Sequence, residues 1–263
     1  MTKPLFLLSN DDGVHAAGIR ALAQAVEPFA DWLIVAPHVE RSGSGHAISL
    51  STPLRLEQLA SNIFAVEGTP ADCVMFAMSK LVSRRPDFVI SGINRGCNIG
   101  QDTLYSGTVA AAMEGCLHGI PAIAVSRQGR RAFALADYAD AIKIVSLLFQ
   151  NPALLAPARA AVLNVNIPDV PLSRMQGFAV AKLGRRIYDN QIAESVDPRG
   201  RPYYWVGGGG EDTQPIAGSD CTLLAAHYIT LTALSPDHAD FKVNEALHAG
   251  LAGALNQSMD NVR

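Results

Sequence analysis

The sequence predicts a doubly wound α/β protein with a mostly parallel sheet. Over roughly the first 150 residues, short apolar runs alternate with segments whose apolar residues recur at helical spacing. Such strict alternation is typical of right-handed β-α-β crossovers on a parallel sheet. The 263 residues, 49% of them hydrophobic, are enough for one large domain with a sizeable core.

Short apolar runs that end at polar loops predict the strands, at residues 5–9, 33–36, 63–66, 88–90 and 122–125. Apolar residues at helical spacing predict the intervening helices, over residues 19–26, 70–81, 108–117 and 134–149. The helix at 70–81 has further support, because Pro70 stands at its first position, where the missing N–H is not needed. The alternating segment 48–56 is expected to form a strand or hairpin outside the main sheet.

The pattern changes after Pro152. A run at 162–165 still fits the main sheet, but the strands predicted at 178–183, 203–206 and 228–234 are joined by long Gly/Pro-rich connections. We therefore expect a Rossmann-like α/β core over residues 1–168 and a β-rich extension over 169–235 that serves as an oligomerisation arm. A C-terminal helix near residues 244–256 is expected to pack on the core, within a segment spanning 236–263.

The composition argues against polyanion and membrane binding and favours contacts between subunits. The net charge of −3 gives no reason to expect binding to a nucleic-acid polymer. The first apolar run is too short for a signal peptide, and no later stretch reaches the length of a membrane span. Only 17% of residues are charged, against roughly 25% on average, which suggests either an oligomer or a surface rich in uncharged polar residues.

The four cysteines form no C-x-x-C pair and no zinc-like spacing; they are Cys73, Cys97, Cys116 and Cys221. This pattern is typical of reduced thiols in a cytoplasmic protein.

The loop after the first strand carries two adjacent acidic residues, Asp11 and Asp12, between Asn10 and Gly13. Ligands of doubly wound sheets bind beyond the carboxyl ends of the strands, so this position favours a functional site. Neighbouring carboxylates repel each other unless a cation lies between them, and Mg²⁺ or Mn²⁺ prefers oxygen ligands. The alternative is an Asx-turn that caps the next helix, with Gly13 supplying a positive φ angle.

Two further loops contain small polar residues. Residues 91–108 end in Ser106, Gly107 and Thr108, where the start of a helix would present N–H groups and its dipole to an anion. The glycines of this loop match neither the dinucleotide-binding nor the P-loop pattern, so nucleotide cofactors of those classes are not expected. Residues 41–46 include Gly43 and would let a ligand approach the backbone closely, although such loops are more often connectors.

Together these loops predict metal-assisted attack of water on a phosphate ester. A covalent intermediate on Asp11 is the less favoured alternative, since the D-x-D spacing of dehalogenase-type phosphatases is absent. Two other classes remain open. One is an oligomer that senses nucleotides or phosphate without turnover, and the other is a sugar-nucleotide transferase, against which the absent D-x-D motif also argues.

Five short motifs follow one another between residues 5 and 126. They are Asn10-Asp11-Asp12-Gly13 with Ala17-Gly18-Ile19, Arg41-Ser42-Gly43, Gly68-Thr69-Pro70-Ala71-Asp72, Ser91-Gly92-Ile93-Asn94 and Tyr105-Ser106-Gly107-Thr108. In type and order they resemble the motifs of the SurE family, whose members are survival-protein-type 5′/3′-nucleotidases.

The resemblance implies a SurE-like fold, a metal and a substrate. One divalent ion per subunit, Mn²⁺ or Mg²⁺, would be held by Asp11, Asp12, Ser42 and Asn94. The expected reaction is hydrolysis of nucleoside 5′-monophosphates, with 3′-monophosphates and short polyphosphate as further substrates. The resemblance also implies a cytoplasmic homodimer or homotetramer built by exchanged C-terminal β arms.

We assign residue roles on this basis. Asp11, Asp12 and Asn98 are the expected catalytic residues, and the expected substrate-binding residues are Asn10, Gly43, Ser106, Gly107 and Thr108. Asn10 and Asn98 would orient phosphate oxygens or the attacking water. Asp102 and Arg95 either contact the substrate or are simply solvated, and Tyr105 either packs against a base or acts as a hydrophobic staple.

Overall fold

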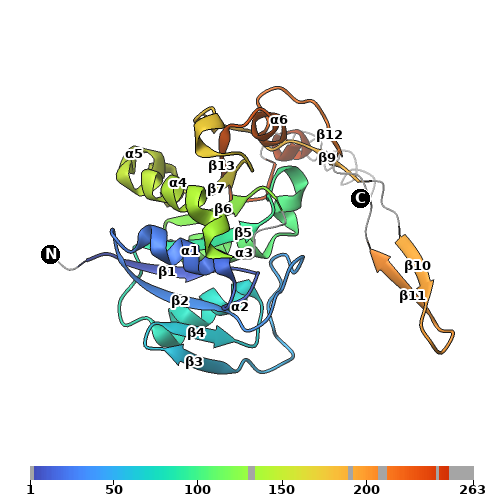
Figure 1. The fold of residues 1–263 in the computed structure, drawn as a ribbon, viewed down its shortest axis with the longest axis horizontal. Helices are drawn as coiled ribbons and strands as arrows, with labels where there is room; N and C mark the ends of the chain where they lie inside the picture. Colours follow the sequence, from blue (N-terminus) through green and yellow to red (C-terminus); the bar gives the residue numbers. More distant parts are fainter. Residues whose placement is uncertain (1–2, 130–133, 189–191, 207–211, 241–242, 249–263) are drawn as a thin grey trace, which may run out of the picture.

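A computed structural model shows a sheet between two layers of helices and describes residues 3–129, 134–188, 192–206, 212–240 and 243–248 (Figure 1). Within these residues the main sheet has nine strands, in the order β3-β4-β2-β1-β5-β6-β7-β13-β8. Strands β4, β2, β1, β5, β6 and β7 run parallel to one another. The predicted doubly wound, mostly parallel α/β fold is therefore confirmed.

The parallel strands of the main sheet and β13 are largely buried, whereas the edge strand β3 is exposed along its length. Their bounds are β1 (Leu5–Ser9), β2 (Asp31–Pro37), β3 (Leu56–Ala60), β4 (Ile63–Val66), β5 (Phe88–Arg95), β6 (Ala122–Arg127), β7 (Val162–Ile167), β8 (Phe178–Val180) and β13 (Ile229–Leu234). Successive residues such as Leu7 and Leu8 are both fully buried, because helices cover both faces of the sheet.

The longer helices pack in pairs on the two faces. Helices α1 (Ala17–Val26) and α4 (Ala139–Gln150) contact each other on one face, and α2 (Pro70–Phe76) and α3 (Gly107–Leu117) on the other. The predicted helix at 70–81 continues past α2 as a π-helix, and the one at 134–149 begins as a 3-10 helix. The shorter elements are η1 (Ala77–Leu81), η2 (Gly100–Leu104), η3 (Leu135–Tyr138), α5 (Pro152–Leu155), η4 (Ala156–Arg159), η5 (Leu172–Arg174) and α6 (Asp220–Ala225).

A capping box fixes the start of α2. The Thr69 hydroxyl accepts a hydrogen bond from the Asp72 N–H, and the Asp72 carboxylate accepts one from the Thr69 N–H at 2.8 Å. Asp72 also accepts bonds from the N–H and hydroxyl of Ser49, at 2.9 and 2.7 Å. Burial acts to raise the pKa of Asp72, but the hydrogen bonds from Ser49 and Thr69 together hold it below its usual value.

The prediction of a strand or hairpin at 48–56, outside the main sheet, was wrong. The segment before Leu56 forms no strand, and β3 pairs antiparallel with β4 as the edge of the main sheet. Strands β13 and β8 also join this sheet, β13 antiparallel to β7 and β8 parallel to β13. The boundary predicted at residue 168 therefore does not coincide with the end of the sheet, since short apolar runs do not reveal their pairing partner.

The part of the 169–235 segment that leaves the main body is a hairpin. Strands β10 (Ile192–Val196) and β11 (Pro202–Val206) pair antiparallel and project away from the sheet (Figure 1). Strands β9 (Arg186–Ile187) and β12 (Asp212–Thr213) pair at its base. Residues 243–248 are helical and exposed, and the rest of the helix predicted at 244–256 lies outside the described residues.

All four cysteines are free, as predicted. In the part of the chain that the structure describes, no single helix is long and apolar enough to cross a membrane. One pair bent by 92°, Leu135–Gln150 with Pro152–Arg159, reaches that length and composition together.

Candidate active site

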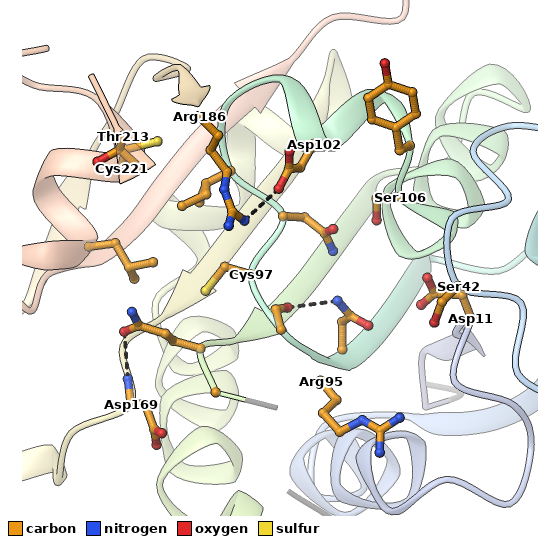
Figure 2. A pocket seen from close by; sticks show the side chains of 18 of the residues that line it. Asp11, Ser42, Arg95, Cys97, Asp102, Ser106, Asp169, Arg186, Thr213 and Cys221 are labelled. Atoms are coloured by element: carbon orange, nitrogen blue, oxygen red, sulfur yellow. Dashed lines mark hydrogen bonds and ion pairs between the residues drawn. The ribbon is translucent and has the colours of Figure 1, made fainter. Parts of the chain in front are cut away.

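The candidate site lies where the order of the parallel strands reverses. The chain proceeds from β1 to β2 on one side and later continues from β5 to β6 on the other, so the carboxyl ends of β1 and β5 flank the switch point. A cleft of about 1320 Å³ opens there. Its lining includes Asp11 and Asp12 after β1, Ser42 after β2 and Asn94 near the end of β5. Asp11 and Ser42 lie on the same side of the cleft in Figure 2. Predicted residues from three separate segments are thus brought to one cleft.

Asp11 is a buried carboxylate held against the first turn of α3. Only 4% of the residue is exposed, and its Oδ1 accepts a hydrogen bond from the Thr108 hydroxyl. Burial raises the pKa of Asp11 to about 6, and the neighbouring charge of Asp12 adds to this, while the Thr108 bonds oppose it. A buried carboxylate beside a second one is a favourable place for a cation.

Asp12 faces the end of β5. Its Oδ2 accepts a hydrogen bond from the Arg95 N–H at 3.2 Å, and the Arg95 guanidinium lies 3.9 Å from Oδ1. Burial raises the pKa of Asp12 above its usual value, and the charge of Glu40 adds to the rise. The Arg95 contacts only partly offset this.

Ser42 and Asn94 supply neutral oxygens. The backbone N–H of Arg41 donates to the Asp11 carbonyl at 2.8 Å, which places the loop of Ser42 beside the acid pair. The Ser42 hydroxyl donates to Glu40 at 2.8 Å, so its lone pairs remain suited to a ligand. The Asn94 amide nitrogen donates to the Gly96 carbonyl at 2.8 Å, which leaves the amide oxygen as the atom to offer a metal.

The donor chemistry fits a hard divalent ion. Among the described residues no group of three or more His, Cys, Asp or Glu side chains is arranged to hold a metal ion, so the candidate set consists of two carboxylates, a hydroxyl and an amide. The Asn10 side chain adds a further indication. Its nitrogen donates to the Gly13 carbonyl at 3.0 Å, but its buried Oδ1 has no hydrogen-bond partner within the described part of the chain. A buried acceptor without a partner is costly unless a ligand or water satisfies it.

Of Ser106, Gly107 and Thr108, which were predicted to bind the substrate phosphate, only Ser106 lines the cleft. Ser106 lines the cleft, but its hydroxyl accepts a bond from the Val109 N–H and caps α3. Thr108 is fully buried, does not line the cleft and binds Asp11, so its predicted contact with substrate is corrected to a role in holding Asp11. Gly107 also lies outside the lining, and a Cβ there would come within 2.7 Å of Asp11. The dipole of α3 therefore acts first on the Asp11 carboxylate.

Asn98 and Gly43 both line the cleft. The Asn98 carbonyl accepts bonds from the side chains of Asn164 and Asn166 on β7, and its own amide donates to the Ser126 hydroxyl at 2.9 Å. These bonds fix Asn98 in place. Gly43 has a positive φ of 75° and open space where a Cβ would lie, so its backbone is accessible to a ligand.

The cleft extends well beyond the predicted residues. Its far side is lined by Asp169, Thr213 and Cys221, opposite Asp11 and Ser42 in Figure 2. Arg186 and Tyr188, at the base of the hairpin, also line it. Sequence reasoning missed these residues because they lie far along the chain and carry no motif.

The fold and the cleft together define an α/β protein with a carboxylate-rich site at the switch point of its sheet. Comparison with known proteins identifies it further. The family model described as survival protein SurE matches residues 6–190, and the chain belongs to the SurE family.

Relatives named 5′-nucleotidase SurE support this assignment. The one from Heliobacterium modesticaldum is 43% identical and covers 97% of this chain and 94% of its own. The one from Anaeromyxobacter dehalogenans strain 2CP-1 is 47% identical and covers 89% of each chain. The crystal structure of the SurE protein from Aquifex aeolicus superimposes with a TM-score of 0.76 at 35% identity, over 92% of this chain and 98% of that one.

Proposed function

We propose that the protein is a metal-dependent 5′-nucleotidase that hydrolyses nucleoside 5′-monophosphates. The observation that carries the proposal is the pair of carboxylates, buried Asp11 and half-buried Asp12, beside neutral oxygen donors in a cleft large enough for a nucleotide. The names of the relatives supply the substrate class. Hydrolysis of 3′-monophosphates and short polyphosphate is included in the proposal as secondary activity.

Asp11, Asp12, Ser42 and Asn94 would hold one Mn²⁺ or Mg²⁺ ion. When bound, the ion would polarise the phosphate ester and activate water for attack. Thr108 holds the Asp11 carboxylate in position through its hydroxyl.

Other residues would bind and orient the phosphate. Ser106 and Gly43 line the cleft beside the acid pair, where backbone N–H groups and small side chains let phosphate oxygens approach. Asn98, fixed by Asn164 and Asn166, would orient a phosphate oxygen or the attacking water through its amide. The Asn10 amide oxygen, which has no partner among the described residues, is suited to accept a hydrogen bond from that water.

The test is phosphate release from a panel of nucleoside 5′- and 3′-monophosphates and tripolyphosphate, with Mn²⁺, Mg²⁺ or a chelator. Wild-type protein is expected to be active only with metal, and Asp11→Asn to lose at least about 100-fold in kcat/KM, the scale of removing one electrostatic group from a site. Asp169→Asn, which changes a carboxylate on the far side of the cleft, is the matched control. Activity that survives both the chelator and Asp11→Asn would refute the metal mechanism, and nucleotide binding without turnover would favour a sensor.

We also propose that the hairpin β10–β11 pairs with a second copy of the chain in a homodimer or homotetramer. Its apolar side chains have no cover in one subunit: Trp205 is 68% exposed and Val206 is 90% exposed. Light scattering tests this with Trp205→Ser/Val206→Ser, which is expected to form smaller assemblies. Leu50→Ser, at an 87% exposed position on the main body, is the control. An unchanged assembly in the double variant would exclude the hairpin.

A cytoplasmic location is part of the same proposal. The four free thiols suit a reducing compartment, where disulfides are rare. Fractionation of cells that produce the protein would test it, and recovery outside the cytoplasm would contradict it.

A further inference from the structure

Helix α3 carries a buried carboxylate that has no part in the chemistry proposed above. Glu114 lies about two turns along α3 and is 9% exposed, and each of its oxygens contacts an imidazole. Its Oε2 lies 2.9 Å from Nε2 of His46, and its Oε1 lies 3.3 Å from Nε2 of His118. A carboxylate only accepts hydrogen bonds, so the imidazole N–H of His46 is the donor in the shorter contact.

His46 stands at the end of the loop that carries Ser42 and Gly43, residues 40–46, which we call the Ser42 loop. Most of this loop is exposed, and its glycines at 43 and 45 have positive φ angles of 75° and 54°. Glycine loses more conformational freedom on ordering than any other residue. A side-chain anchor at the end of such a loop therefore matters, because it restricts the loop before a ligand binds.

The Ser42 loop contacts the acid pair directly. The Arg41 N–H donates a hydrogen bond to the Asp11 carbonyl at 2.8 Å. A Cβ at Gly107 would come within 2.7 Å of Asp11 Cβ and 3.0 Å of Ser44 Oγ, so the loop, Asp11 and the first turn of α3 meet at one point. Asp11 and Ser42 also lie on the same side of the cleft in Figure 2.

Helix α3 thus holds two segments that carry proposed metal ligands. Near its start the Thr108 hydroxyl binds Asp11 Oδ1, and about 9 Å further along the helix axis Glu114 binds His46. Because one helix fixes both Asp11 and the end of the Ser42 loop, it also sets the spacing of the ligands before the metal arrives. Ligands that are ordered in advance lose less conformational entropy on binding, which raises affinity.

We propose that His46, held by Glu114, is a positioning residue that keeps the Ser42 loop against the acid pair and so raises the affinity of the site for its divalent ion. The proposal rests on the proposed function, in which Ser42 is a metal ligand. His118 provides a matched control. Its imidazole contacts the same carboxylate, but it lies at the C-terminal end of α3, far from the turn that meets Asp11.

Calorimetry measures the Mn²⁺ affinity of wild type, His46→Ala, His46→Gln and His118→Ala. His46 is exposed, so its truncation leaves no buried cavity. His46→Ala is expected to weaken Mn²⁺ binding about 10-fold, the scale of one hydrogen bond to a charged group. His46→Gln keeps an N–H donor of similar reach and is expected to restore most of the affinity. His118→Ala is expected to change the affinity by less than about 2-fold.

Hydrogen exchange of the metal-free protein tests the positioning step by itself. In His46→Ala, the backbone amides of residues 41–46 are expected to exchange at least about 5-fold faster than in wild type, while those of α1 keep the wild-type rate. Faster exchange in both segments would indicate a general loss of stability, and the proposal would be wrong.

The affinities are equally decisive. An unchanged Mn²⁺ affinity in His46→Ala would overturn the proposal, and so would equal losses in His46→Ala and His118→Ala. If His46→Gln bound Mn²⁺ as weakly as His46→Ala, the imidazole would not act by donating to Glu114, and the proposal would again be wrong. If wild-type protein bound no Mn²⁺, the proposed function itself would have failed, and the exchange rates alone would decide whether His46 positions the loop.

Discussion

The buried carboxylate of Asp220 links the segment that begins at Gly100 to the segment around Gly184, and replacing it tests how much this link stabilises the fold. It is fully buried and accepts backbone N–H bonds from Gly100, Gly184 and Cys221, at 2.9, 2.7 and 2.8 Å. In Asp220→Ala, the Gly100, Gly184 and Cys221 N–H groups all lose this acceptor in a region with little access to water. Each such group costs about 1–3 kcal/mol, so the expected loss of unfolding free energy is at least about 4 kcal/mol.

For a chain of this length, that loss lowers the melting temperature by roughly 8–16 °C. Circular dichroism measures the melting curves of wild type, Asp220→Ala and the control Asp197→Ala. Asp197 also accepts backbone N–H bonds, from Arg199 and Arg201 at 2.8 and 3.0 Å, but water can replace it because it lies in the exposed hairpin turn. Equal shifts in the two variants, or a shift below about 2 °C for Asp220→Ala, would refute the reasoning.

Three further predictions concern titration and hydrogen bonding. Because burial raises the pKa of Asp11 to about 6, protons compete with the metal below that pH, and calorimetry should show Mn²⁺ affinity falling about tenfold per pH unit there. A flat affinity between pH 7 and pH 5 would contradict this. Thr108→Val removes a bond that lowers the pKa of Asp11, so the same fall should begin at higher pH, and an unchanged midpoint would argue against the assigned role. Asp72→Asn should cost about 1 kcal/mol at neutral pH in urea unfolding, the value of a helix cap. The folded-state pKa of Asp72 lies below its usual 3.8. The ionised carboxylate therefore stabilises the fold above pH 3.8, and this stabilisation is lost as the pH falls through the folded-state pKa. If Asp72→Asn still lowered the unfolding free energy by the same amount at about pH 2, the loss would not come from the charge of the Asp72 carboxylate.

The sequence was informative where chemistry is encoded locally. The apolar run before Asn10 and the acid pair after it were enough to place Asp11 and Asp12 at a strand end, and the structure puts them in the cleft. The start of α2 was also readable, because Pro70 marks the first helical position. Both features depend on neighbours in the chain, which is why pattern and spacing reveal them.

The sequence was uninformative where distant segments meet. The Asp102–Arg186 pair joins residues 84 apart in the chain, and the bond between Asp220 and Gly100 spans 120 residues. Thr108 was misjudged for a related reason, because a hydroxyl at a helix start can face a ligand or a neighbouring carboxylate, and only tertiary packing decides which. Strand β13 likewise gave no sign that it would pair with β7 in the main sheet.

The charge balance of the cleft supports the metal proposal more strongly than any single ligand does. Two arginines line it, but Arg186 is paired with Asp102, and Arg95 lies 3.9 Å from Asp12 and 3.5 Å from Glu40. Against them stand five lining carboxylates, Asp11, Asp12, Glu40, Asp102 and Asp169, of which Asp169 is paired with Arg127 outside the lining. A cleft with this excess of negative charge repels a phosphate dianion unless a cation is added. Among the described lining residues, both arginines already lie beside carboxylates. If the proposed metal supplies the positive charge that binds the phosphate ester, removing it should abolish substrate binding as well as turnover.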